Sequence, residues 1–312
     1  MKTKTRRLLQ PIWNAFESLL PSDGFILCVS GGSDSRALLE AIACWPHRFE
    51  NIHVVSVDHA TRLESKREAE AVCARARVLG FGAQVLSLYP ASKKDEASLR
   101  SGRYGLIWQA AQKLSMGSIV TAHTQDDQAE SFVMDMMGHG GGAEGSAMPA
   151  RSKHSEGLVL RPLLEFSRAY LIAVLTELNQ LDYFTDPTNQ QSLGARVQVR
   201  DFLKLHPAPQ ARLASLAQKR QADLEALQHW ASGLIEIHGV QRVLVRLEPN
   251  TPEAVLLQAF KKALSSLLPN RDLRGANKTL GLMVKQRTGK WSLPGCVAEI
   301  KASNVVFLGK IG

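Results

Sequence analysis

The sequence predicts an α/β fold in which a doubly wound, mostly parallel sheet is followed by a second, smaller and basic α+β domain. Between Gly24 and about Met137, short apolar runs alternate with stretches of helical length and periodicity. Such alternation implies parallel strands joined by crossover helices. Beyond about Leu205 the alternation stops and basic residues accumulate. We therefore expect two domains, residues 1–205 and residues 206–312.

The elements of the first domain follow from its hydrophobic pattern. The N-terminal segment is basic and then amphipathic, and it lacks the continuous apolar core of a signal peptide, so we expect a helix. Four apolar runs are typical of strands buried on both faces: residues 24–30, 52–59, 84–89 and 118–123. Three longer stretches between them predict helices: residues 35–45, 65–80 and 97–115.

The rest of the first domain is less regular. The glycine-rich residues 138–157 predict a loop. Residues 158–164 predict a further strand, and residues 167–180 a helix with Ser167 at its N-cap.

Polar residues follow three of the predicted strands, as Ser30–Ser35, as Asp58-His59 and as His123–Asp127. In a doubly wound sheet, ligands bind at the carboxyl ends of strands next to the switch in strand order. We expect a ligand site there.

The predicted second domain contains two helices, residues 211–234 and residues 252–268 with Pro252 at the start, and strand-like residues 291–300 and 304–309. Residues 206–312 hold 15 Lys and Arg against 7 Asp and Glu, a balance of +8, whereas residues 1–205 are nearly balanced. This basic excess indicates a polyanionic partner, most simply a nucleic acid backbone. The alternative is that the charge serves solubility alone.

Composition excludes several classes of protein. With 45% hydrophobic and 21% charged residues, the chain is neither disordered nor, for want of an apolar run of about 20 residues, membrane-spanning. The four cysteines, Cys28, Cys44, Cys73 and Cys296, form no CxxC pair and favour a reducing, cytoplasmic location.

The stretch Ser30–Ser35 reads Ser-Gly-Gly-Ser-Asp-Ser between a strand and a helix. Gly31 and Gly32 allow backbone N–H groups to approach an anion, and the start of the helix favours phosphate. Ser30, Ser33 and Ser35 add hydroxyl donors, whereas the Asp34 carboxylate suits a phosphate site only when Mg²⁺ lies between them. A plain turn is the alternative interpretation.

An ordered set of motifs resembles one enzyme family. SGGxDS after a first strand resembles the PP-loop of the N-type ATP pyrophosphatases. Within that superfamily, "TAHTQDDQAES" at 121–131 is similar to a segment of the tRNA(Ile)-lysidine synthetase family. Further matches follow in order: "VDHATRLESKREAEAV", "LRSGRYGLI", "RPLL", "DPTN", Arg196–Arg200 and "SLPG". The chain departs from the family pattern at Met137-Gly138-His139-Gly140 and at Val197.

The resemblance implies a two-step, ATP-dependent ligation in the CAU anticodon of an isoleucine tRNA. The C2 oxygen of the wobble cytidine is first adenylated, with release of pyrophosphate. Free L-lysine then displaces AMP and forms lysidine. ATP and Mg²⁺ are the implied cofactors, and a homodimer is compatible with the sequence.

The resemblance also implies roles for site residues. Ser30, Gly31, Gly32, Ser33, Asp34 and Ser35 bind ATP, and the catalytic set is Asp34, His123, Asp126 and Asp127. Asp34 and Asp127 are the expected metal ligands, and the other aspartate orients lysine. Arg103, Arg196 and Arg200 contact tRNA or substrate, whereas Asp58 and His59 are second-rank candidates near adenine.

Each assignment has a structural alternative. A histidine at a strand end can serve hydrogen bonding alone. Asp126 and Asp127 can cap the helix that they begin, and the arginines can lie on exposed helix faces.

The predicted tRNA contacts in the second domain form a group: Lys261, Lys262, Arg271, Arg274, Lys285, Arg287 and Lys290. Two rival functions remain open. One is another PP-loop enzyme, such as a tRNA sulfurtransferase or an amide-forming ligase, although the scattered cysteines disfavour sulfur transfer. The other is a non-catalytic RNA-binding relative.

Overall fold

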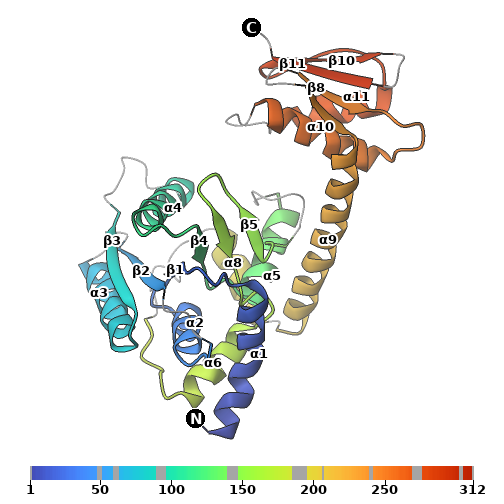
Figure 1. Cartoon of the computed structure of the whole chain (residues 1–312). Coiled ribbons are helices and arrows are strands. Elements are labelled where there is room, and N and C mark those ends of the chain that lie inside the picture. The colour runs from blue at the N-terminus through green and yellow to red at the C-terminus, as the bar shows by residue number, and fades with distance from the viewer. Residues whose placement is uncertain are drawn as a thin grey trace. The chain divides into compact units, whose positions relative to one another are not determined.

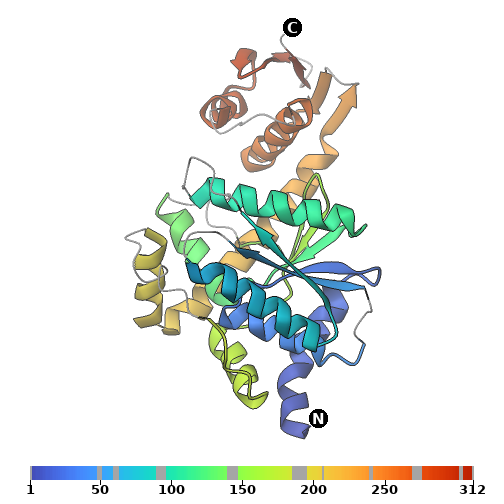
Figure 2. The same cartoon turned by 90° about the vertical axis from the view of Figure 1, so that its left-hand side faces the viewer.

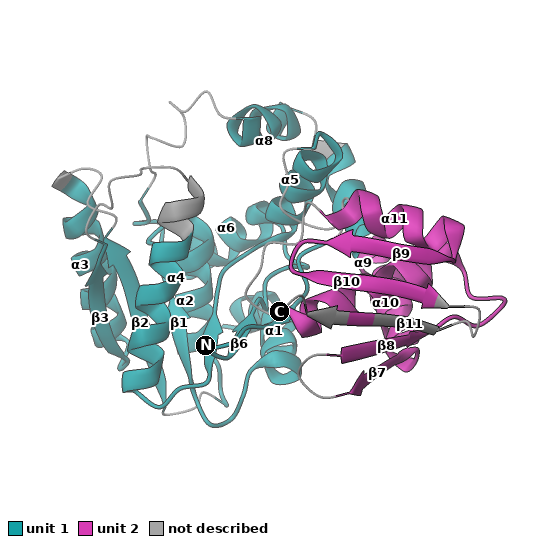
Figure 3. Cartoon of the chain, turned by 90° about the horizontal axis from the view of Figure 1, so that it is seen from above, with its two compact units in different colours: residues 1–218 teal, residues 219–312 magenta. Residues whose placement is uncertain are grey.

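The computed structural model describes residues 2–47, 51–58, 63–88, 96–138, 147–184, 195–205, 207–238, 242–268, 276–301 and 305–310. The chain divides into two compact units, Met1–Gln218 and Lys219–Gly312 (Figure 1, Figure 3). The predicted α/β class is confirmed. Within the described ranges, no helix has the length and apolarity needed to cross a membrane.

Unit 1 is built on a six-stranded sheet in the order β3-β2-β1-β4-β6-β5. Its strands are β1 (Phe25–Cys28), β2 (Ile52–Asp58), β3 (Gly82–Ser87), β4 (Ser118–Val120), β5 (Arg151–Lys153) and β6 (Leu158–Leu160). Every neighbouring pair is parallel except β5 with β6. The chain fills one side of β1 with β2 and β3 and then crosses to the other side with β4, so the strand order switches beside β1.

The edge strand β5 corrects the prediction of a loop over residues 138–157. Arg151–Lys153 pairs with β6 in antiparallel register, with Ser152 opposite Val159. The three residues of β5 are all polar, so they carry no hydrophobic signal, and β6 supplies the hydrogen-bonding partner. Residues 139–146 lie outside the described segments.

Helices cover both faces of this sheet (Figure 2). Along β1, Phe25 and Leu27 join the core formed with α1 (Thr3–Leu19), α2 (Ser33–Ala43), α3 (Leu63–Val78) and α6 (Arg168–Glu177). Ile26 faces the opposite way and packs with α4 (Glu96–Lys113). This alternation is the two-sided burial expected of parallel strands. The predicted N-cap is confirmed, since Ser167 Oγ accepts the Tyr170 N–H at 3.2 Å.

Two further helices extend unit 1 beyond the carboxyl ends of the strands. α5 (Gln125–Met136) packs on α8 (Ala195–Leu205) through a small apolar cluster of Ala129, Val199 and Leu203. The next helix, α9 (Pro207–Gly233), begins where the sequence places the domain boundary and continues past the contact-based division at 218/219. The two boundaries differ because a continuous helix carries no change of pattern at Gln218.

Unit 2 has a five-stranded antiparallel sheet in the order β7-β8-β11-β10-β9, with α10 (Glu253–Leu267) and α11 (Asn277–Gln286). The strands are β7 (Ile235–His238), β8 (Arg242–Arg246), β9 (Gly289–Leu293), β10 (Cys296–Lys301) and β11 (Val305–Lys310). Phe260 and Met283 from the helices pack with Val243 and Ala298 from the sheet. β7, β8 and α11 were not predicted, because they are short and their apolar residues follow no long run.

Candidate active site

A cavity of about 560 Å³ opens at the carboxyl ends of β1 and β4, beside the switch in strand order. Its polar lining comes from the loop after β1, with Ser30, Ser33, Asp34 and Ser35, and from Thr121 and His123 after β4. Cys28, Val55, Val57 and Ile107 add apolar lining. The structure thus brings the first and third predicted polar clusters together. Asp58 does not line the cavity and accepts a hydrogen bond from Ser65, and His59 lies outside the described residues.

The loop after β1 is held in a tight, hydrogen-bonded turn. Gly31 has a φ of +89°, a conformation that favours glycine. Its N–H donates to Ser35 Oγ at 3.1 Å, and that hydroxyl donates to the Gly32 carbonyl at 3.0 Å. Ser30 Oγ lies 3.2 Å from Ser35 Oγ. Hydrogen bonds within the loop therefore fix its shape.

The same loop leads into the N-terminus of α2. Gly32 is the N-cap and has no side chain to cap the helix, so the N–H groups of the first turn stay available. These N–H groups at the cavity wall form a site that suits an anion such as pyrophosphate, whereas the Ser35 hydroxyl donates to Gly32 and the Ser33 hydroxyl donates to Asp34 Oδ1 at 3.1 Å.

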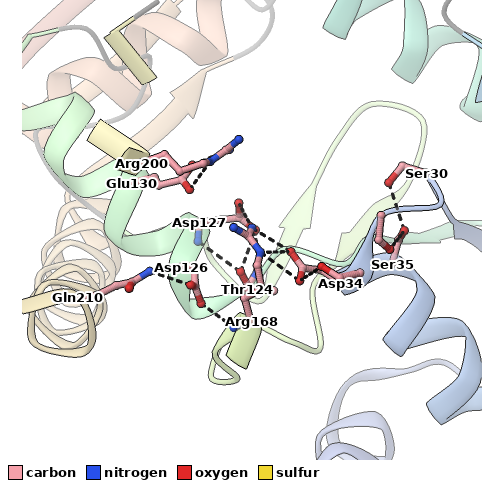
Figure 4. Close-up of polar contacts among 12 residues, drawn as sticks. Ser30, Asp34, Ser35, Thr124, Asp126, Asp127, Glu130, Arg168, Arg200 and Gln210 are labelled. Carbon is pink, nitrogen blue, oxygen red and sulfur yellow. Dashed lines mark hydrogen bonds and ion pairs between the residues drawn. The ribbon is translucent and has the colours of Figure 1, made fainter. Parts of the chain in front are cut away.

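Asp34 lies at this wall and is paired with Arg168 of α6 (Figure 4). The guanidinium donates to the carboxylate at 3.0 Å from Nε and lies 2.9 Å away at Nη2. Burial raises the pKa of Asp34, and the Arg168 charge lowers it without reversing the shift. The charged carboxylate is therefore not fully compensated by the arginine, and further positive charge would stabilise it.

The two aspartates at the start of α5 have different surroundings. Thr124 and Asp127 form a capping box: the Thr124 N–H donates to Asp127 Oδ2 at 2.8 Å, and the Asp127 N–H donates to Thr124 Oγ1 at 3.4 Å. Asp127 Oδ1 faces Arg168 Nη2 at 3.9 Å. One oxygen of Asp127 thus builds the helix start, and the other is directed to the guanidinium beside Asp34.

Asp126 uses both of its carboxylate oxygens within the protein. Oδ2 accepts the Arg168 N–H at 2.7 Å, and Oδ1 accepts from Gln210 Nε2 of α9 at 2.8 Å. Neither Asp126 nor Asp127 lines the cavity, whereas Asp34 and Arg168 do. Asp126 therefore fixes the start of α6, from which Arg168 extends.

His123 and Arg103 approach the cavity from different elements. His123 follows β4, and its Nδ1 lies 2.8 Å from Thr121 Oγ1, which sets the orientation of the ring. Arg103 extends from α4 over the Tyr104 ring, with its guanidinium carbon 5.8 Å from the ring centroid. Burial raises the pKa of the neighbouring Cys28 thiol to about 12, although the Arg103 charge opposes the shift.

The two predicted arginines of α8 converge on a buried carboxylate, Glu130 of α5, which is 1% exposed. Arg200 pairs with both oxygens, at 2.7 Å from Nε and 2.9 Å from Nη2, whereas Arg196 makes one contact of 3.4 Å. The hydrogen bonds to Glu130 raise the pKa of Arg200. Arg200 also lines the cavity, together with Lys204, but Arg196 does not.

Sequence reasoning missed four side chains at this site: Glu130, Arg168, Phe184 and Lys204. A signal existed for Glu130 and Lys204, because each lies one helical turn after a predicted site residue, Asp126 and Arg200 respectively. Ser167-Arg168 follows "RPLL" in the set of motifs that resembles the family, but the sequence predicted no role for Arg168 and gave no signal for Phe184, because their contacts with Asp34 and Gly31 span more than a hundred residues.

The site suits Mg²⁺ that arrives with a nucleotide. Among the described residues, no group of three or more His, Cys, Asp or Glu side chains is arranged to hold a metal. Asp34 and Asp127 nevertheless direct carboxylate oxygens at one cation, the Arg168 guanidinium. Mg²⁺ usually takes one or two carboxylates and completes its shell with water and substrate phosphates, so these two residues fit it.

Comparisons with known proteins agree with this geometry. A family described as the PP-loop domain matches residues 1–206. The tRNA(Ile)-lysidine synthase of Bradyrhizobium diazoefficiens is 34% identical over 263 residues, which cover 81% of this chain and 71% of that protein. The tRNA(Ile)-lysidine synthase of Zymomonas mobilis is 30% identical and covers 88% of both chains.

A solved structure shares the fold of the chain. The U34-tRNA thiolase NcsA from Methanococcus maripaludis aligns with a TM-score of 0.57 at 14% identity, over 70% of this chain and 80% of that one. At this identity the likeness concerns the fold alone.

Proposed function

Because the chain belongs to the tRNA(Ile)-lysidine synthase family, with a PP-loop domain over residues 1–206, we propose that it converts the wobble cytidine of an isoleucine tRNA to lysidine. The reaction consumes ATP and free L-lysine and releases pyrophosphate and AMP. The enzyme is thus an ATP-dependent ligase that forms a carbon–nitrogen bond on the CAU anticodon.

One observation carries this proposal at the level of the site: a single cavity is lined both by the anion-binding loop and by apolar side chains. Its volume of about 560 Å³ lies within the usual range of ligand sites. The triphosphate of ATP suits the loop Ser30–Ser35, and the base suits the apolar side chains of Val55, Val57 and Ile107.

The first step is attack of the cytidine C2 oxygen on the α-phosphorus of ATP. A phosphorus–oxygen bond forms to the base, and the bond between the α-phosphorus and the bridging oxygen breaks. The N–H groups at the start of α2 and the hydroxyls of the loop stabilise the pyrophosphate that leaves. We assign His123 to the α-phosphate, since Thr121 holds its ring at the cavity wall.

The second step is attack of the lysine ε-amine on C2, which expels AMP. The amine must first lose the proton that it carries as an ammonium. The Asp34 carboxylate, which lines the cavity, attracts this cation after the pyrophosphate of the first step has left, and it can accept the proton that the amine loses. Because both oxygens of Asp126 are engaged, we assign to it the positioning of α6.

Mg²⁺ held by Asp34 and Asp127 would neutralise charge on the phosphates as pyrophosphate leaves. Arg103 and Arg200 line the cavity and are suited to contacts with the nucleotide or the anticodon, whereas Arg196 does not line it and contacts Glu130. Arg200 thus combines a structural ion pair with a place at the cavity wall.

For unit 2 we propose the phosphate contacts that hold tRNA outside the active site. Lys262, Lys285 and Lys290 are exposed, which supports this role. Arg287 is better assigned to folding, because it donates to the Thr251 carbonyl at 3.0 Å and to the Pro249 carbonyl at 3.4 Å. Arg271 and Arg274 lie outside the described residues. A cytoplasmic location suits these substrates, and a homodimer stays a prediction for sedimentation analysis.

The rival thiolation chemistry fits the site less well. Sulfur transfer by a protein persulfide needs a thiolate, and burial raises the pKa of Cys28, the cysteine at the cavity wall, to about 12. The four cysteines are all free thiols, and none of the described groups forms a metal or cluster site.

The test uses the purified chain, an isoleucine tRNA transcript with a CAU anticodon, ATP, Mg²⁺ and labelled lysine. We expect label in the RNA and its loss in Asp34→Ala, with Arg6→Gln on the exposed face of α1 as the charge control. Pyrophosphate release without lysine incorporation would support ATP cleavage at the loop Ser30–Ser35 and exclude ligation of lysine to the tRNA. Binding of tRNA with neither product would favour the non-catalytic relative.

A further inference from the structure

Arg168 connects both acidic parts of the site with one side chain and one backbone group (Figure 4). Its guanidinium contacts Asp34 at 2.9 Å and faces Asp127 at 3.9 Å, and its backbone N–H donates to Asp126 at 2.7 Å. The residue begins α6, so its backbone is fixed while its long side chain crosses to the loop after β1.

The charges explain why a cation lies between these carboxylates. Asp34 and Asp127 are both carboxylates and repel each other. The Arg168 guanidinium lies 2.9 Å from Asp34 and 3.9 Å from Asp127, and an arginine side chain keeps its charge in proteins. Arg168 therefore stays charged and neutralises the pair.

A magnesium ion bound to the same two carboxylates would need the space and the charge balance that Arg168 now provides. Two cations cannot share this position without strong repulsion at a separation of a few ångströms. The guanidinium has an alternative partner, because it also lines the cavity that suits the triphosphate. Guanidinium groups pair with phosphate oxygens as readily as with carboxylates.

We propose that Arg168 is a positioning residue that keeps Asp34 and Asp127 together before the nucleotide arrives, competes with the metal for them, and then transfers its guanidinium to the phosphates of ATP. The proposal rests on the proposed use of ATP, but it does not depend on the acceptor. Arg168 thereby weakens metal binding in the absence of nucleotide and couples metal binding to nucleotide binding. Without phosphate, the metal ion and the Arg168 guanidinium do not occupy the site together.

The experiment measures Mn²⁺ binding to the full chain by electron paramagnetic resonance, without tRNA or lysine. Arg168→Gln should bind Mn²⁺ more tightly than the original chain without nucleotide, with a Kd lower by about tenfold, on the order of the Coulomb energy of one neighbouring charge. Arg168→Lys keeps a cation and should stay close to the original Kd. Arg6→Gln removes an exposed charge of α1 and should leave the Kd unchanged.

The same titrations with an α,β-methylene analogue of ATP give the second half of the prediction. The analogue should improve Mn²⁺ affinity strongly in the original chain and less in Arg168→Gln, because only the original chain has a guanidinium to transfer. An unchanged or weaker Mn²⁺ affinity in a folded Arg168→Gln would overturn the proposal. So would an equal effect of the analogue in both proteins.

A measurement on the unsubstituted chain covers the case in which Arg168→Gln fails to fold. The Arg168 Nε–H donates to Asp34 at 3.0 Å, so its ¹⁵N resonance should be slow to exchange with water. Mg²⁺ should shift the resonance and speed its exchange, and the analogue should slow that exchange again. A resonance that Mg²⁺ leaves unchanged would reject the competition. Failure of lysine ligation alone would reject only the acceptor proposed above.

Discussion

Phe184 holds the loop after β1 through a backbone hydrogen bond and leaves no room for a side chain at Gly31. The Phe184 N–H donates to the Gly31 carbonyl at 2.9 Å, and its ring carbon Cδ2 lies 2.8 Å from the point where a β-carbon on residue 31 would lie. The residues just before Phe184 are anchored to α2, where Arg36 contacts Gln180 and Asp182 at 2.9 Å each. Residues 180–184, which Arg36 holds to α2, thus support the loop Ser30–Ser35.

This relationship predicts the effect of a methyl group in the loop. Gly31→Ala combines a φ of +89° with a contact of 2.8 Å, so it should cost about 1–3 kcal/mol of stability and abolish most pyrophosphate release. Gly32→Ala is the matched control for stability, because its φ is −70° and the nearest atom is 3.9 Å away. Its cost should stay below about 1 kcal/mol.

Phe184→Ala separates the ring contact from the backbone strain as causes of the stability lost in Gly31→Ala. In that background Gly31→Ala should cost less, because the ring contact is gone, but the backbone strain should remain. Chemical denaturation of the original chain, Gly31→Ala, Phe184→Ala and the double variant measures the coupling energy between the two substitutions. Equal costs of Gly31→Ala in both backgrounds would show that the ring does not restrict the loop.

The buried carboxylate of Glu130 should contribute strongly to stability. Glu130→Gln leaves Arg196 and Arg200 without their anion in a site that is 1% exposed, and we expect a loss of about 3 kcal/mol. Arg200→Gln should cost more than Arg196→Gln, since it removes two short contacts instead of one of 3.4 Å. Thermal unfolding ranks the three variants, and the reverse order of the two arginines would contradict the geometry.

The environment of His53 in β2 predicts a loss of stability at mildly acidic pH. Burial, and then the Arg77 charge, lowers the pKa of His53, and its Nε2 is buried without a hydrogen-bond partner among the described residues. The unfolded chain therefore takes up this proton more readily than the folded one. The contribution of neutral His53 is complete above about pH 6.5 and declines as the pH falls through the lowered pKa.

His53→Gln tests this assignment because glutamine does not titrate. Between about pH 7.5 and pH 5, the thermal midpoint of the original chain should fall further than that of His53→Gln. The control is His47→Gln at an exposed position, which should follow the original chain. Parallel curves for His53→Gln and the original chain would exclude His53 as the cause.

The exposed lysines of unit 2 should control how tRNA binding depends on salt. Replacement of Lys262, Lys285 and Lys290 by Gln should weaken binding and reduce the slope of log K against log salt by up to about 3. The control changes three exposed lysines of unit 1, Lys66, Lys113 and Lys153, to Gln. An unchanged slope in the first triple variant would place the tRNA contacts elsewhere.

Much of the fold was predictable because its signals are local. Apolar runs gave β1, β2, β4 and β6, since two-sided burial requires continuous hydrophobic residues. Ser167 and the Asp126-Asp127 pair marked helix starts, since capping uses neighbours within one turn. The all-polar edge strand β5 escaped prediction because its partner strand, and not its own side chains, makes it a strand.

For the site, the sequence by itself determined the chemical inventory: the loop Ser30–Ser35, His123 and the acidic pair, in the order expected of one enzyme family. Only the tertiary structure decided which of these groups hold the fold together and which lie at the reacting site. It engaged both oxygens of Asp126, directed one oxygen of Asp127 at Arg168, and paired Arg168 with Asp34. The reason is physical: charge neutralisation depends on distance in space, and residues far apart along the chain meet only where the switch in strand order brings their loops together.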